Sequence, residues 1–169
     1  MSKRGCDNLL ILDTDAASVL AKSKILYEML KLFDQHKVTI APKIEEELEK
    51  PLDYGYIYPE EIFEKVETVG IKQTEKDRYR SWFEETSVDK GELEATAVAE
   101  NRNAIFFTMD KQAQKFAEEK GVQNLSFNNL IKLMNKKKIL TEEEIREALE
   151  KIEERDSRKI QIDEVLEEK

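Results

Sequence analysis

Short, unbroken runs of large apolar residues alternate along the chain with longer segments in which apolar residues recur every three or four positions. The clearest runs lie at 9–12 and 104–107. A short run of this kind is typical of a strand that is buried on both faces, as in a parallel sheet. The longer segments have the period of helices with one buried face. The alternation therefore predicts a mostly parallel sheet with helices packed against it.

Capping and turn residues divide this pattern into individual elements. The predicted fold class is α/β, a three-layer α/β/α sandwich around a mostly parallel five-stranded sheet. One domain is expected to span 1–140, and 141–169 are expected to form a C-terminal helical extension packed on it or on a partner. We expect strands at 9–13, 38–41, 67–71, 104–108 and 122–127, and helices at 14–21, 23–35, 42–48, 59–66, 74–85, 89–99, 111–120 and 128–138.

Acidic residues follow both of the strands that have the buried pattern. Asp13 ends the first strand, and Asp110 comes just after the run at 104–108. In open α/β folds, ligands bind at the carboxyl ends of the strands. An acid at such a position can also do no more than cap the next helix. For the first strand, this alternative applies to both Asp13 and Asp15.

Two further acids are expected near the starts of helices. Glu47 lies beside a core position, at the edge of the helix face that packs inward. In a later helix, Asp89 can be the N-cap, and Glu92 then occupies the capping-box position. Glu94 has no such local role and borders a face of small residues. The pattern therefore favours Glu94 over Glu92 as the functional acid.

Asp13, Glu47, Glu94 and Asp110 are thus predicted to meet at one edge of the sheet. Buried acids without partners repel one another and resist ionisation. A divalent cation removes that conflict, and ligands that are all oxygens suit Mg²⁺ or Mn²⁺. A centre of this kind lowers the pKa of bound water and neutralises charge on a phosphate. The acids therefore predict hydrolysis of a phosphodiester.

Composition limits the other kinds of site. The 169 residues include one cysteine and one histidine, Cys6 and His36, which exclude a Cys/His zinc cluster within one chain and argue against a Cys–His or Ser–His nucleophile. The charged content of 38% is a pattern common in thermophile proteins. The net charge of −9 argues against strong nonspecific binding to phosphates. No segment resembles a signal peptide or a membrane span, so we expect a cytoplasmic protein.

Four motifs occur in an order that resembles the PIN-domain ribonucleases of the VapC type. The motifs are LLILDTDAAS, VTIAPKIEEEL, KGELEATAVAEN and AIFFTMDKQAQKFA. The third acid of the family pattern is more often Asp than Glu. The chain exceeds a minimal toxin of this family at 51–86 and beyond 140, and in this it looks more like stand-alone archaeal members.

The resemblance implies an endoribonuclease that cleaves single-stranded RNA, with water attacking phosphorus. It implies Mg²⁺ or Mn²⁺ bound by the catalytic acids Asp13, Glu47, Glu94 and Asp110. The partners implied are single-stranded RNA, a second copy in a homodimer, and an antitoxin protein, as in VapBC toxin–antitoxin pairs. The residues expected to support the four acids are Thr14, Asp15, Ser18, Glu92 and Thr108.

Two other functions fit part of the sequence. A non-catalytic PIN fold that serves as a scaffold or binds a partner is expected to take up no Mn²⁺. A haloacid-dehalogenase-type phosphatase uses a DxD motif, with Asp13 as the nucleophile and Asp15 as the general acid. That family typically has Gly-Thr after the second Asp and a late Asp-Asp pair. This chain has Ala16-Ala17 and the single Asp110 instead.

Residues 51–58 are the least regular segment and hold three of the five tyrosines. The segment is interpreted as a packed loop or a dimer contact. The alternative interpretation is a flap whose aromatic rings stack on bases. The sequence alone leaves both open.

Overall fold

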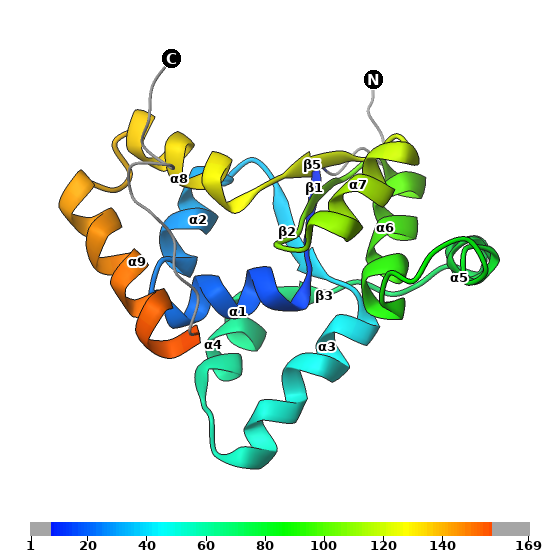
Figure 1. Cartoon of the computed structure of the whole chain (residues 1–169), viewed down its shortest axis with the longest axis horizontal. Coiled ribbons are helices and arrows are strands. Elements are labelled where there is room, and N and C mark those ends of the chain that lie inside the picture. Colours follow the sequence, from blue (N-terminus) through cyan, green and yellow to red (C-terminus); the bar gives the residue numbers. More distant parts are fainter. Residues whose placement is uncertain (1–7, 157–169) are drawn as a thin grey trace.

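The structure, a computed structural model, describes residues 8–156 (Figure 1). Five strands form one sheet in the order β3-β2-β1-β4-β5, and every neighbouring pair is parallel. The predicted α/β fold with a parallel five-stranded sheet flanked by helices is therefore confirmed. The strands are β1 (Leu9–Leu12), β2 (Lys37–Ile40), β3 (Glu67–Thr68), β4 (Ile105–Phe107) and β5 (Gln123–Leu125).

The central strand β1 has the burial that its apolar run predicts. Leu10, Ile11 and Leu12 have no exposed surface. The strand pairs with β2 on one side and with β4 on the other, in register with Phe107 opposite Leu12. The ladder continues for one residue past the strand, because the amide of Asp13 donates to the carbonyl of Phe107 at 3.0 Å. Asp13 therefore leaves the sheet at a position fixed by backbone pairing.

Two groups of helices cover the sheet. The first group is centred on α1, which contacts α2, α3, α4 and α9, while α8 contacts α2. The second is centred on α6, which packs against β1 and β4 and contacts α3, α5 and α7. The helices are α1 (Thr14–Lys22), α2 (Leu26–Leu32), α3 (Pro42–Glu49), α4 (Tyr58–Lys65), α5 (Gln73–Ser81), α6 (Lys90–Arg102), α7 (Lys111–Glu119), α8 (Phe127–Lys136) and α9 (Glu142–Asp156), with a 3-10 helix η1 (Lys50–Tyr54) after α3.

The helix predicted at 74–85 begins and ends earlier than expected. The sequence Thr74-Glu75-Lys76-Asp77 predicts a capping box, but this is wrong, because the amide of Lys72 donates to the carboxylate of Glu75 at 2.9 Å and α5 begins one residue earlier. The sequence also predicts that Trp82 and Phe83 lie on the buried side of this helix; Trp82 is buried, whereas Phe83 is 37% exposed. The other differences are in length, since the helix predicted at 23–35 shortens to α2 and the edge strand at 67–71 shortens to β3.

The C-terminal helix α9 covers part of the first group of helices. Its amide and hydroxyl contacts form a reciprocal capping box, in which Thr141 N donates to Glu144 and Glu144 N donates to the hydroxyl of Thr141. Its apolar stripe, which includes Ile145 and Ile152, is buried, and the helix contacts α1. The sequence continues with the apolar residues Ile160, Ile162, Val165 and Leu166. These four residues and Cys6 lie outside the described residues.

No helix in the part of the chain from 8 to 156 combines the length and the apolar character needed to cross a membrane.

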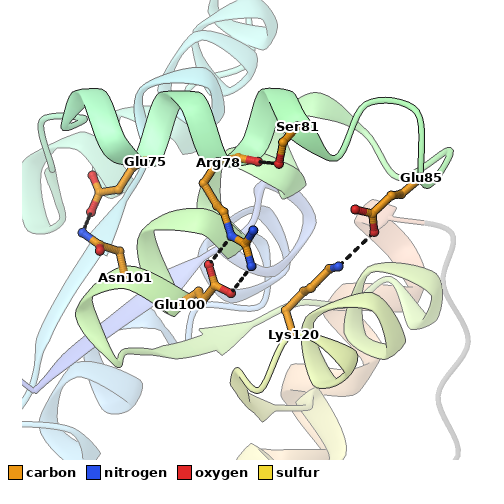
Figure 2. Close-up of polar contacts among 7 residues, drawn as sticks. All are labelled: Glu75, Arg78, Ser81, Glu85, Glu100, Asn101 and Lys120. Carbon is orange, nitrogen blue, oxygen red and sulfur yellow. Dashed lines mark hydrogen bonds and ion pairs between the residues drawn. The ribbon is translucent and has the colours of Figure 1, made fainter.

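Helix α5 lies outside α6, on the side away from the sheet (Figure 1). Figure 2 shows its polar contacts with α6, where Arg78 forms two hydrogen bonds with Glu100 at 2.9 and 3.0 Å. The deepest contact is made by Glu75, which is 1% exposed and accepts hydrogen bonds from Asn101 at 2.9 Å and from Arg102 at 2.7 Å. Burial alone would raise the pKa of Glu75, but the hydrogen bonds from Arg102 and Lys72 hold it below its usual value. The buried ion pair therefore fixes α5 onto α6.

We expect Arg102→Ala to lower the free energy of unfolding by roughly 3 kcal/mol, because it leaves a buried carboxylate without its cation. Arg78→Ala is the matched control, since the Arg78–Glu100 pair is more exposed and its loss should cost less than about 1 kcal/mol. Urea denaturation at neutral pH measures both values. Equal losses in the two variants would contradict the distinct role of the Glu75–Arg102 pair.

Candidate acidic site

Asp13 is held by three donors at the carboxyl end of β1. Its side chain caps α1 by accepting the amide of Ala16 at 2.7 Å, and it also accepts the hydroxyl of Thr108 and the amide of Met109. The side chain is 1% exposed, and burial raises its pKa to about 6 although these hydrogen bonds oppose the shift. Asp13 is thus both a helix cap and a buried, tightly positioned acid.

Asp110 is linked to Asp13 through Thr108. The hydroxyl of Thr108 donates to Asp13 and accepts the amide of Asp110 at 3.0 Å. The carboxylate of Asp110 caps α7 by accepting the amides of Gln112 and Ala113 at 2.8 and 3.1 Å. Both amides bond to the same oxygen, Oδ1, so the described cap leaves Oδ2 to other ligands. The neighbouring parallel strands β1 and β4 therefore deliver two acids to the same edge, as predicted.

Glu92, in the first turn of α6, faces these two acids. The pKa of Glu92 is raised to about 8. Burial is the largest cause, and the negative charges of Asp13, Asp110 and Asp89 act in the same direction. A hydrogen bond with the backbone of Asp89 acts in the opposite direction. The side chain of Asp89 makes no capping hydrogen bond, so the expected reciprocal capping box at the start of α6 is not formed. Glu92 instead lies where the charges of Asp13 and Asp110 act on it.

Glu47 approaches the first residues of α1 and α6 from α3. Its Oε1 accepts the hydroxyl of Thr14, the first residue of α1. Its Oε2 lies against α6, where a Cβ added at Gly91 would stand 3.0 Å from it. The absence of a side chain at Gly91 thus allows the carboxylate of Glu47 to approach the first turn of α6. We refer to Asp13, Glu47, Glu92 and Asp110 as the acidic site.

The structure places Glu94 differently from the expectation. Its carboxylate is buried and accepts the amide of Lys43 at 2.8 Å, in the first turn of α3. Burial raises its pKa, the contact with Lys43 lowers it, and the nearest acid that raises it is Glu46. Glu94 therefore caps α3 from a neighbouring helix, while Glu92 is the acid of α6 that faces Asp13. Helix periodicity could not reveal this, because the capped amide belongs to a segment 51 residues away.

The residues expected to support the acids divide by their contacts. Thr14 donates to Glu47, and Thr108 donates to Asp13. Asp15 is exposed, and its charge contributes to the raised pKa of Asp13. Ser18 is buried within α1. The two threonines therefore hold the acidic site directly.

A divalent cation fits the chemistry of this donor set. The side chains of the acidic site offer only oxygens, which Mg²⁺ and Mn²⁺ prefer. Burial raises the pKa values of Asp13 and Glu92, nearby negative charges add to both shifts, and a cation would oppose them. Among residues 8–156, no three acids, histidines or cysteines stand close enough together to hold an ion. The expected convergence of four carboxylates on one ion is therefore not seen, since Glu94 accepts the amide of Lys43 and Glu47 accepts the hydroxyl of Thr14.

Glu92→Gln should become progressively more stable than the unaltered protein as pH rises from about 4.5 to 8. A raised pKa means that the folded state holds the proton more tightly than the unfolded state, so folding stability falls through this window. We expect a gain of roughly 1 kcal/mol at pH 9, after allowance for solvent screening of a half-buried group. Urea denaturation in EDTA at pH 5 and pH 9 measures it, and parallel pH dependences would contradict the clustering of Glu92 with Asp13 and Asp110.

Glu94→Ala should lower the free energy of unfolding by about 1–2 kcal/mol, because it leaves the buried amide of Lys43 without an acceptor. Glu94→Gln retains an oxygen at the same place and should keep most of that stability. Thermal unfolding of both variants tests the capping role. If the glutamine variant were as unstable as the alanine variant, accepting the amide of Lys43 would not be what Glu94 contributes to stability.

Comparisons with known proteins bear on the family and the fold of the chain. The sequence model of the PIN domain family DUF3368 matches residues 9–167. A solved structure with a similar fold is that of VapBC-1 from nontypeable Haemophilus influenzae, with a TM-score of 0.56 and 16% sequence identity over 70% of this chain and 97% of that chain. No curated protein matches the chain by sequence. The strand order, the acids at the carboxyl ends of β1 and β4, and the family match over nearly the whole chain lead to one conclusion: the chain belongs to the PIN domain family.

Proposed function

We propose that this protein is a nuclease that hydrolyses phosphodiester bonds of single-stranded RNA with the help of Mg²⁺ or Mn²⁺. The observation that carries the proposal is the link through the hydroxyl of Thr108 between Asp13 and Asp110. Glu92 lies near enough for burial and the charges of these two acids to raise its pKa. Membership of the PIN domain family supports it. The fold similarity to VapBC-1 supports a toxin-like role in which an antitoxin protein and a second copy of the chain are partners.

The acidic site supplies the ligands in this proposal. Asp13, Glu92 and Asp110 would hold the cation, and Glu47 would join them from α3. A bound divalent cation activates water and neutralises charge on the phosphate. Glu92 holds a proton near neutral pH and releases it when the site takes up a cation, so cation affinity should rise with pH. Thr108 keeps Asp13 oriented, and Glu94 keeps α3 in place so that Glu47 remains at the site.

The alternative functions make different demands on these residues. A phosphatase of the haloacid-dehalogenase type needs Asp15 as a general acid beside Asp13, yet the side chain of Asp15 is exposed. A non-catalytic scaffold needs no cation. A cytoplasmic location and an origin in a thermophile are consistent with the composition and form part of the proposal.

Wild-type protein should cleave a fluorescent single-stranded RNA in the presence of Mn²⁺. Asp13→Asn should reduce the cleavage rate at least about 100-fold, because replacing a residue that only supports a metal ligand already lowers activity by up to about 100-fold. Asparagine preserves the cap of α1, so the variant should remain folded. Glu118→Gln, at an exposed position of α7, is the control and should keep full activity. Equal cleavage by wild type and Asp13→Asn would refute the proposed nuclease.

The same assay separates the two acids of α6. Glu92→Gln should lose cleavage like Asp13→Asn, whereas Glu94→Gln should retain it. Loss of cleavage in Glu94→Gln with retention in Glu92→Gln would instead restore the assignment made from sequence. Asp15→Asn tests the phosphatase alternative, which predicts hydrolysis of a phosphate monoester that this change abolishes.

A further inference from the structure

A groove begins at Glu47 and leads away from the acidic site. Its first part, about 350 Å³, is lined by Glu47, Lys22, Lys50 and the side chains around η1. Its second part, about 800 Å³, shares Lys22, Tyr56 and Tyr58 with the first and continues between the end of α1 and α4. In Figure 1, α3 and α4 lie at the lower end of the view and both contact α1. The groove is therefore continuous with one of the acids of the proposed catalytic site.

Exposed aromatic rings line the start of the groove. Tyr54 is 82% exposed and Tyr56 is 61% exposed, although large apolar side chains in the described part of the chain are mostly buried. The ring of Tyr58 packs edge-on against Tyr56 at 6.3 Å, and the ammonium of Lys22 lies 4.8 Å above the Tyr58 ring. Tyr58 is thus anchored by its neighbours, whereas Tyr54 and Tyr56 present their rings to solvent.

The turn that carries these rings has a defined backbone. Gly55 has φ of +90°, a left-handed conformation that suits glycine, and it separates Tyr54 from Tyr56. The amide of Gly55 donates to Leu52 at 3.2 Å, and the amide of Tyr56 donates to Pro51 at 3.1 Å. The exposure of the two rings is therefore a consequence of a hydrogen-bonded turn at the end of η1.

The charges along the groove indicate which end would receive phosphates. Lys22 and Lys50 line the part next to Glu47, in a chain whose net charge is −9. Lys22 also lines the far part together with Lys24, but there the acids Glu60, Glu61 and Glu64 outnumber the lysines. A polyanion would therefore be attracted to the end of the groove that joins the acidic site and repelled from the opposite end.

We propose that Tyr54 and Tyr56 form a stacking subsite for two unpaired bases of a single-stranded nucleic acid, whose adjoining phosphates lie by Lys22 and Lys50 and lead to the acidic site. This inference rests on the proposed function for the identity of the ligand. Aromatic rings beside a basic groove bind single strands without reading sequence, because every base has a face that stacks. The subsite thus selects unpaired strands and sets the direction in which they enter.

Binding can be measured separately from cleavage. The anisotropy of a fluorescent single-stranded oligonucleotide, titrated in EDTA, reports affinity without hydrolysis. Tyr54→Ala/Tyr56→Ala should weaken binding at least about tenfold, in keeping with the usual value of base stacking on aromatic rings. Tyr54→Phe/Tyr56→Phe should bind like wild type, because stacking does not need the hydroxyls. Tyr27→Ala is the control, since Tyr27 is 56% exposed and has Lys31 5.0 Å above its ring, but lies outside the groove.

The charged end of the subsite has its own measurement. Lys50→Gln should weaken binding and make it less dependent on salt, with the slope of log affinity against log salt falling by about 0.7. A duplex of the same sequence should bind the wild type more weakly than the single strand does, because its bases are not available for stacking.

The outcomes distinguish this inference from the nuclease proposal. Glu118→Gln, at an exposed position of α7, should bind the oligonucleotide as the wild type does in EDTA. If wild type cleaves RNA but the tyrosine double alanine variant binds with unchanged affinity, the subsite is refuted and the nuclease stands. If wild type does not cleave but the alanine variant loses binding, the subsite stands and the nuclease fails. If sedimentation shows that the alanine variant turns a dimer into monomers with unchanged oligonucleotide affinity, the tyrosines form a protein interface and the subsite is refuted.

Discussion

Mutual repulsion of carboxylates is the constraint on which the arrangement of this protein depends. Burial raises the pKa of Glu92, and the charges of Asp13 and Asp110 lie close enough to raise it in the same direction. Neutral donors oppose this repulsion without removing the charges: Thr108 and two backbone amides hold Asp13, and two amides hold Asp110. The starts of helices provide such donors, because their first amides have no partner within the helix. The fold therefore places acids where unpaired amides are concentrated.

Apolar patterning predicted the fold because buried parallel strands and amphipathic helices have strong local signatures. The placement of Asp13 and Asp110 was also local, since Asp13 directly follows β1 and Asp110 comes three residues after the end of β4. The distinction between Glu92 and Glu94 was not, because it depends on the amide of Lys43 in another helix. The predicted cap of α5 was wrong for a similar reason, since the carboxylate of Glu75 is fixed by Arg102 across the interface with α6. Sequence patterns miss those polar side chains whose partners come from elsewhere in the chain.

Several contacts that hold the site come from the part of the chain that packs around α6. Glu94 joins α6 to α3, and the Glu75–Arg102 pair joins α6 to α5. Gly91 allows α3 to bring Glu47 against the first turn of the same helix. Helix α6 also packs against β1 and β4, the two strands that end at Asp13 and Asp110. Contacts with α6 therefore help to fix the acids of the acidic site, which come from four segments of the chain.

The caps formed by Asp13 and Asp110 have a consequence for evolution. Each acid stabilises the helix that follows it, and replacing such a cap typically costs about 1 kcal/mol even in a protein without any catalytic role. Selection for folding alone would therefore retain both acids in a descendant that had lost its activity. Glu92 contributes negative charge that the fold resists, so an inactive descendant would gain stability by discarding it. Among relatives, the residue at the Glu92 position is thus the more informative marker of retained chemistry.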